Sequence, residues 1–130
     1  MKGYSSIDYN EQFKIRPRRN ASAKHEVIKL LIVLKILEKF KHNLHWIRIY
    51  TEYVLGNKKV CDIYFENVKT NEIICYEIQS NISEKWLKET QEFYENFDRI
   101  YFKTDWILIK EKELSSDIET LENQVKELIA

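Results

Sequence analysis

Glycine, proline and cysteine are all scarce in this chain, which has two glycines, one proline and two cysteines among 130 residues. Two glycines cannot supply a glycine-rich phosphate loop or a dinucleotide-binding fingerprint, so both of these nucleotide sites are excluded. Two cysteines without clustered histidines exclude a zinc site. Isoleucine, lysine, glutamate and tyrosine are plentiful instead, which favours regular structure with short connections over disorder.

Long apolar segments are also missing. The apolar run from Val27 to Leu37 contains Lys29 and Lys35 and is too short to span a bilayer. Residues 1–10 lack the apolar centre of a signal peptide. We therefore expect no membrane partner and a cytoplasmic, or more generally intracellular, location.

An excess of charge of either sign is absent as well, because 21 basic residues balance 21 acidic ones. A net charge of zero argues mildly against a strong nucleic-acid binder. The charges are unevenly spread, however, since residues 1–25 are mainly basic and residues 111–130 are acidic. The chain has the length of one domain, so we expect a basic N-terminal arm (1–19), a compact core (20–110) and a C-terminal helix (111–130). The alternative for the arm is a solvated tail without a binding role.

Apolar periodicity predicts a helix, three strands, a second helix, one or two further strands and a last helix. Both of the first two helices start with residues suited to cap the free N–H groups of a first turn, namely Ser22 or Asn20, and Ser83. Composition and periodicity alone establish only a small α/β domain. The expected elements are a helix from about residue 22 to residue 40, strands near residues 46–55, 58–65 and 73–79, a helix over 83–97, one or two strands within 99–109, and a helix from about residue 116.

Acidic residues interrupt two of the expected strands, at Asp62 and at Glu77. Because acids are poor strand formers, we expect a compensating interaction, and a hard divalent metal held between paired carboxylates would provide it. The polar segment between the strands predicts an antiparallel hairpin in which Asn67 pairs with Glu72 around a four-residue loop. This register places Asp62 directly across from Glu77, on a face that Gln79 shares.

The same register places Cys61 and Cys75 on opposite faces of the sheet, so we expect core-filling thiols and no disulfide between them.

Asp62 followed by Glu77-Ile78-Gln79 resembles the signature of the PD-(D/E)XK nuclease superfamily, with glutamine where most members carry lysine. The downstream residues are similar to the CoiA-like competence proteins, a branch that also favours glutamine; they are Tyr76–Ser83, Trp86-Leu87, Thr90, Tyr94 and Trp106–Leu108. Upstream, Arg19-Asn20 and His25-Glu26 at the start of an apolar helix resemble the region of the N-terminal glutamate in archaeal Holliday junction resolvases. The resemblance covers about residues 20–110.

This resemblance implies a restriction-endonuclease-like αβββαβ core with a mixed central sheet flanked by helices, and a metal-dependent DNA endonuclease that hydrolyses phosphodiester bonds. Asp62, Glu77 and the carbonyl oxygen of Ile78 would ligate Mg²⁺, for which Mn²⁺ can substitute. Glu26 would assist at the metal, or else would only complement the dipole of its helix. Gln79 can exchange hydrogen bonds but cannot supply the positive charge of the usual lysine.

Several basic residues are candidates for nucleic-acid binding: Arg16, Arg18, Arg19, Lys58, Lys59 and Lys85. Any of the three lysines is also a candidate to replace the charge missing at Gln79. His25 either orients a phosphate or water or merely occupies a helix end, and we expect Glu52 to face solvent. Four aromatic residues are expected in the core or sheet rather than as platforms for stacked bases: Trp46, Tyr50, Tyr53 and Tyr64.

Two questions of function stay open at this point. The nuclease fold can be a catalyst, or it can be an inactive module that binds nucleic acid or protein. The last helix carries apolar residues at three-four-three spacing, which favours either a homodimer through that seam or packing against the sheet. These residues are Ile118, Leu121, Val125 and Leu128.

Overall fold

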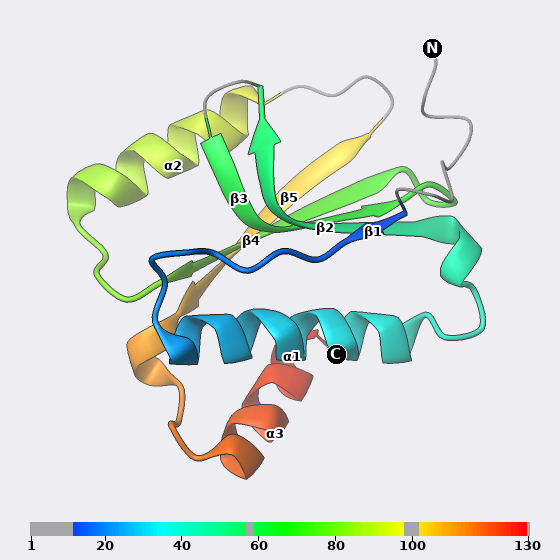
Figure 1. The fold of residues 1–130 in the computed structure, drawn as a ribbon. Helices are drawn as coiled ribbons and strands as arrows, with labels where there is room; N and C mark the ends of the chain where they lie inside the picture. The colour runs from blue at the N-terminus through cyan, green and yellow to red at the C-terminus, as the bar shows by residue number, and fades with distance from the viewer. Residues whose placement is uncertain (1–11, 57–58, 98–101, 130) are drawn as a thin grey trace.

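The structure, a computed structural model, describes residues 12–56, 59–97 and 102–129. These residues form one mixed sheet in the order β1-β2-β3-β4-β5, together with three α-helices (Figure 1). Strands β2, β3 and β4 are antiparallel neighbours, whereas β1 joins β2 and β5 joins β4 in parallel. The predicted α/β fold class, with a mixed sheet flanked by helices and a C-terminal helix, is therefore confirmed. The elements are β1 (Phe13–Lys14), α1 (Ala23–Lys39), β2 (Ile47–Leu55), β3 (Lys59–Asn67), β4 (Glu72–Gln79), α2 (Glu84–Asn96), β5 (Lys103–Lys110) and α3 (Ile118–Ile129), with 3-10 turns η2 (Leu44–Trp46) and η3 (Glu111–Glu113).

Serine side chains cap α1 and α2 where the sequence predicts. Ser22 Oγ accepts a hydrogen bond from the backbone N–H of His25, and Ser83 Oγ accepts one from that of Trp86, both at 3.0 Å. Each bond satisfies a donor that the first turn of a helix leaves without a partner. Ser22, rather than Asn20, is thus the cap of α1, and the caps fix the two helix starts that flank the candidate site.

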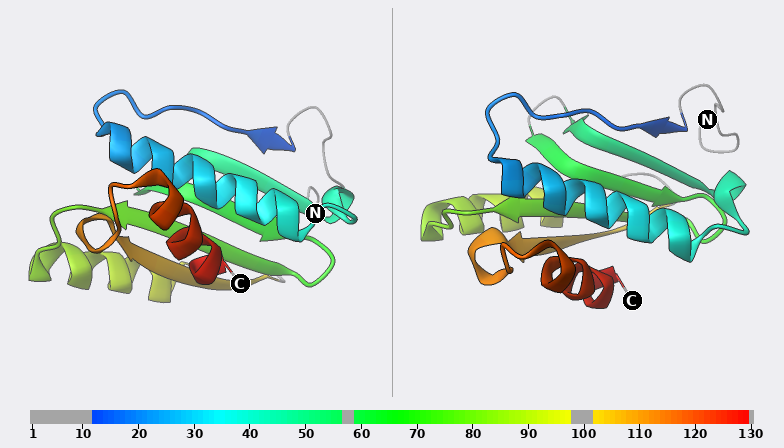
Figure 2. Two further views of the ribbon diagram at one scale, coloured as in Figure 1. Left: turned by 90° about the horizontal axis from the view of Figure 1, so that it is seen from below. Right: turned by 60° about the horizontal axis from the view of Figure 1, so that its bottom comes forward.

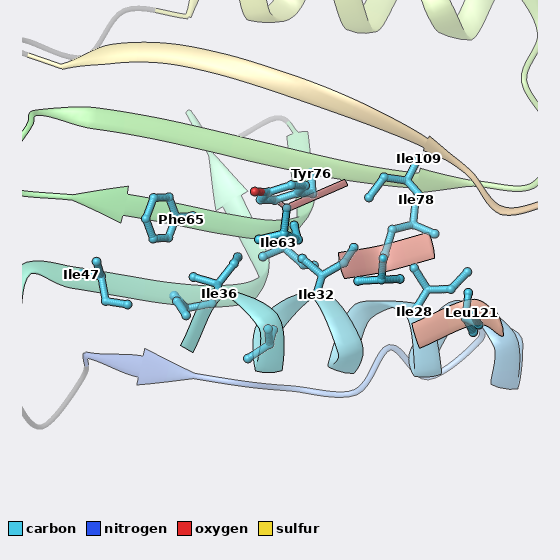
Figure 3. Packing of buried hydrophobic residues seen from close by; sticks show 14 residues of the cluster. Ile28, Ile32, Ile36, Ile47, Ile63, Phe65, Tyr76, Ile78, Ile109 and Leu121 are labelled. Carbon is cyan, nitrogen blue, oxygen red and sulfur yellow. The ribbon is translucent and has the colours of Figure 1, made fainter. Parts of the chain in front are cut away.

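Helices cover both faces of the sheet, with α1 and α3 on one side and α2 on the other (Figures 1 and 2). Three isoleucines of α1, at four-residue spacing, turn toward the sheet, and Figure 3 shows them meeting side chains from β2 to β5. This packing removes a continuous apolar stripe from water, the main favourable term in folding. The labelled core residues are Ile28, Ile32, Ile36, Ile47, Ile63, Phe65, Tyr76, Ile78, Ile109 and Leu121.

Helix α3 packs against α1 through two of the four apolar residues that the sequence places at three-four-three spacing. Leu121 and Val125 are buried in the core cluster, while Ile118 and Leu128 remain exposed. The alternative of packing within the chain is thus realised for the two central positions, although on α1 as well as on the sheet. Self-association through this helix stays a prediction.

The second face of the sheet holds a smaller cluster, to which both cysteines belong. The expectation that Cys61 and Cys75 lie on opposite faces is therefore wrong. Cys61 and Tyr64, three residues apart, lie in the same cluster, so the strict alternation of a strand is interrupted between them. Both thiols are free and buried, which agrees with the expected core-filling role.

The described part of the expected N-terminal arm lies along β2. The buried Gln12 side chain donates hydrogen bonds to the carbonyl oxygens of Leu44 and Ile47, and the backbone N–H of Arg16 donates to Thr51 Oγ1. Residues 12–16 are therefore fixed to the sheet, and residues 1–11 of the predicted arm lie outside the described residues. Among the residues that the structure describes, no helix is both long and apolar enough to cross a membrane.

Helix α1 offers a matched pair of substitutions that tests the packing. Ile32 is completely buried, whereas Leu34 on the outer face is 57% exposed. We expect Ile32→Ala to lower the free energy of unfolding by about 2–5 kcal/mol because it leaves a cavity, and Leu34→Ala to change it by about 0.5 kcal/mol or less. Urea denaturation measures both values, and similar losses for the two variants would contradict this placement of α1.

Candidate functional site

The hairpin of β3 and β4 has the predicted register. Its pairs run from Asn67 with Glu72 to Ile63 with Tyr76, and Asp62 comes directly after the last of them. At this point the Asp62 side chain takes the place of a backbone acceptor: its Oδ2 accepts a hydrogen bond of 2.7 Å from the backbone N–H of Ile78. The acid on β3, which is only 3% exposed, is thus tied to the backbone of the Glu77-Ile78-Gln79 segment.

The other oxygen of Asp62 faces two basic side chains, one before α1 and one in its first turn. Asp62 Oδ1 lies 3.3 Å from His25 Nε2 and 3.6 Å from the guanidinium of Arg18. The interaction with Asp62, helped by Glu26, holds the pKa of His25 above its ordinary value even though burial lowers it. The buried Nε2 has no partner at hydrogen-bond geometry. The buried His25 ring therefore lies between the carboxylates of Glu26 and Asp62 and does more than occupy the helix end.

Glu77 engages helix α2 on the other face of the sheet, so the expectation that Asp62 and Glu77 share one face is wrong. Because the alternation of β3 is interrupted between Cys61 and Tyr64, Asp62 and Ile63 both lie on the α1 side. The Glu77 Oε2 accepts a hydrogen bond of 2.5 Å from the Tyr94 hydroxyl and lies 3.7 Å from Lys59 Nζ. Burial raises the pKa of Glu77 to about 7, although the Tyr94 hydroxyl and the Lys59 charge favour the ionised form. The charge of Asp62 makes a smaller contribution to the raised pKa of Glu77.

Lys59 is the lysine that stands beside the Glu77 carboxylate. Its ammonium group also donates to Thr90 Oγ1 at 3.3 Å and lies 5.2 Å from the centroid of the Trp86 ring. Of the other two candidates for the missing charge, Lys85 is exposed on α2 and Lys58 lies outside the described residues.

Tyr94 is a site residue to which the sequence assigned no role beyond its place in the family resemblance. Trp86, Thr90 and Tyr94 recur at intervals of four, which sets all three on one face of α2. That face meets Lys59 and Glu77. The spacing was visible in the sequence, but the strand that it faces was not.

Glu26 belongs to a second charged cluster, which Lys29 organises. Lys29 is 1% exposed, and its Nζ lies 2.9 Å from Glu26 Oε1, 3.2 Å from Glu52 Oε2 and 2.8 Å from the Arg16 carbonyl oxygen. Burial opposes ionisation of Glu26, but hydrogen bonds from the Arg18 N–H, Lys29 and His25 outweigh it and lower the pKa of Glu26 to about 2. Glu26 is thus linked to Asp62 through the His25 ring.

The expectation that Glu52 faces solvent is wrong. Its side chain is half-buried against Lys29, and its backbone has a φ of 51°, in the left-handed region that residues other than glycine rarely adopt. A strained residue within a strand persists only where its surroundings hold it, and such residues gather at functional sites. Lys29, four residues after His25, was the missed signal, because it is a charge within the buried stripe of α1.

The structure therefore brings some predicted site residues together and leaves others apart. Asp62 contacts the backbone of Ile78, next to Glu77, and Arg18 reaches Asp62. Gln79 is half-buried at the end of β4. The remaining predicted residues, Arg16, Arg19 and Lys85, have exposed side chains.

The predicted metal ligands form a sparse set. Within residues 12–56, 59–97 and 102–129, no three His, Cys, Asp or Glu side chains are grouped so as to hold a metal. Mg²⁺ keeps several waters and needs only one or two carboxylates, so Asp62, Glu77 and the Ile78 carbonyl fit its donor chemistry. A cation held by both acids would compete with Arg18 and His25 for Asp62 and with Tyr94 and Lys59 for Glu77.

Two lysines of α1 test the charged cluster: Lys29 is buried, whereas Lys35 is half-buried and pairs with an exposed acid. Lys29→Met leaves Glu26 and Glu52 without their shared cation, so we expect a loss of about 3 kcal/mol in the free energy of unfolding. Lys35 makes a comparable 3.2 Å ion pair with the half-exposed Glu122, so Lys35→Met should cost about 0–1 kcal/mol. Urea denaturation at pH 7 compares them, and equal losses would show that Lys29 is not the centre of the cluster.

Comparisons with known proteins add no relative: no family model, no curated protein and no solved structure matches this chain.

Proposed function

We propose that this protein is a metal-dependent DNA endonuclease whose centre is Asp62 and Glu77. The observation that carries the proposal is the unfavourable state of Glu77, which is 2% exposed and has its pKa raised to about 7 beside a second buried acid. Perturbed acids gather at functional sites. A divalent cation at the end of the β3–β4 pairing would draw the two carboxylates together from the two faces, stabilise both charges and explain why acids occur in these strands.

The roles of the residues follow from their contacts. Asp62, Glu77 and the Ile78 carbonyl would hold Mg²⁺ or Mn²⁺, which when bound neutralises phosphate charge and supplies hydroxide near neutral pH. Lys59 provides, beside Glu77, the positive charge that Gln79 lacks. Gln79 would orient the attacking water through hydrogen bonds, and Glu26 would act by positioning His25 against Asp62.

The substrate is assigned from the cations around this centre. Arg18 reaches Asp62 with a half-exposed side chain, and Arg16 and Arg19 are exposed nearby in the sequence. Contacts from arginine to phosphate are the usual source of affinity for nucleic acid. A DNA substrate also agrees with the intracellular location expected from the sequence.

A second candidate function is an inactive nuclease-fold module that binds nucleic acid. It is favoured by the present partners of Asp62, since one oxygen accepts a hydrogen bond from the Ile78 N–H and the other faces two basic side chains. In this alternative, Arg18 and His25 take the place of a metal permanently. Metal binding separates the two candidates.

The raised pKa of Glu77 predicts a pH-dependent stability. Glu77 ionises at about 7 in the folded chain against an ordinary value of 4.5, so the folded state binds more protons between these values and stability falls as pH rises through this window. We expect Glu77→Gln to match wild type at pH 5 and to exceed it at pH 8 by on the order of 3 kcal/mol. Thermal unfolding without metal measures the difference, and a less stable variant at both pH values would show that ionised Glu77 is a structural requirement.

Cleavage and metal binding test the proposed centre. We expect wild type to gain thermal stability with millimolar Mg²⁺ or Mn²⁺ and to cut DNA, whereas Asp62→Asn and Glu77→Gln lose both properties. Glu66→Gln is the matched control, because Glu66 is equally buried on β3 but interacts with Tyr64 and Arg48. Linear, nicked and four-way DNA are tested in parallel. No metal shift and no cleavage by wild type would exclude the enzyme and leave the binding module.

A further inference from the structure

Three cations occupy alternate positions on the segment that leads to Asp62. Lys14 and Arg16 line the same hollow beside β2, and Arg18 reaches the Asp62 carboxylate. Where a chain is extended, alternate side chains share one side and recur about every 6.6 Å, and Lys14 and Arg16 agree with this because both line the hollow. That interval is close to the spacing of successive phosphates along one nucleic-acid strand. We call Lys14, Arg16 and Arg18 the basic track.

The track is held rigidly in place. The backbone N–H of Arg16 donates to Thr51 Oγ1, and the Thr51 hydroxyl donates to the Arg16 carbonyl oxygen at 3.0 Å. Lys29 Nζ donates to the same carbonyl oxygen at 2.8 Å. Buried side chains therefore fix the backbone at Arg16, so little backbone ordering is needed when Arg16 binds a partner.

The hollow beside the track has a volume of about 330 Å³ and contains two tyrosines. Tyr50 and Tyr53 are half-buried and rest on Tyr64, which is completely buried. Their ring centroids lie 5.9 and 4.5 Å from that of Tyr64. The sequence led us to expect both tyrosines to be core or sheet aromatics; they do pack against the second core cluster, and both also line the hollow. The remaining lining comes from Thr51, Glu52 and Val54.

We propose that the basic track and the tyrosine pair bind one strand of DNA, with phosphates on Lys14, Arg16 and Arg18 and bases stacked at Tyr50 and Tyr53. A basic groove beside aromatic rings is the general way of holding single strands, because every base has a face that can stack. A duplex keeps its bases stacked on one another and offers no such face. The choice of DNA rests on the proposed function, since Arg18 directs the bound strand toward Asp62.

Binding without metal tests this surface separately from catalysis. The probe is a fluorescent oligo(dT) of twelve nucleotides, measured by anisotropy in EDTA between 50 and 300 mM salt. For three phosphate contacts on a single strand we expect a slope of log K against log salt of about −2, and Arg16→Ala should reduce its magnitude by about 0.7. Lys41→Ala, which removes an exposed lysine outside the track, should keep the wild-type slope.

Tyrosine variants separate stacking from folding. Tyr53→Phe keeps the aromatic face and should bind as wild type does, whereas Tyr53→Leu keeps apolar packing on Tyr64 and should bind about 5- to 100-fold more weakly. Thermal midpoints confirm that both variants are folded. Equal binding by Tyr53→Leu and Tyr53→Phe would overturn the stacking role.

Competing ligands decide the class of partner. An unlabelled single strand should displace the probe, and a duplex with the same number of phosphates should displace it only at a much higher concentration. A duplex that competes equally well, or an RNA strand that binds more tightly, would overturn the assignment to single-stranded DNA. Binding without any metal-dependent cleavage would support this surface and refute only the proposed endonuclease.

Discussion

The hydrogen bond from the Ile78 N–H to the Asp62 carboxylate determines how the candidate site is arranged. It lies where the regular pairing of β3 and β4 ends, so a side chain takes over the acceptor role of the backbone. Because Asp62 is held against β4, its second oxygen is turned toward Arg18 and His25. The segment before α1, the helix start and the two central strands therefore meet at one carboxylate.

The acids on the two sides of the sheet have different surroundings. Asp62 and Glu26 are surrounded by basic side chains and N–H donors, and the pKa of Glu26 falls to about 2 as a result. Glu77 has one hydroxyl and one lysine at longer range, so burial raises its pKa to about 7. Such an imbalance is costly for stability, and proteins commonly accept that cost where an activity depends on it. The functional proposal depends on this contrast.

The sequence predicted those features that depend on local rules. Loop length set the hairpin register from Asn67 to Glu72, capping set the helix starts at Ser22 and Ser83, and periodicity set the inner face of α1. Features that depend on tertiary docking were not accessible in the same way. Lys29 and Tyr94 acquire their roles only when α1 and α2 meet the sheet, and the cysteines share one cluster because alternation breaks between Cys61 and Tyr64.

The central claim is that Asp62 and Glu77 hold one divalent ion together. Calorimetric titration of Mn²⁺ into wild type, Asp62→Asn, Glu77→Gln and the double variant at pH 8 tests it most directly. Joint ligation predicts one site in wild type, a large loss of affinity in each single variant, and little further loss in the double variant. Undiminished Mn²⁺ binding by the double variant, or independent additive losses from the two substitutions, would contradict it.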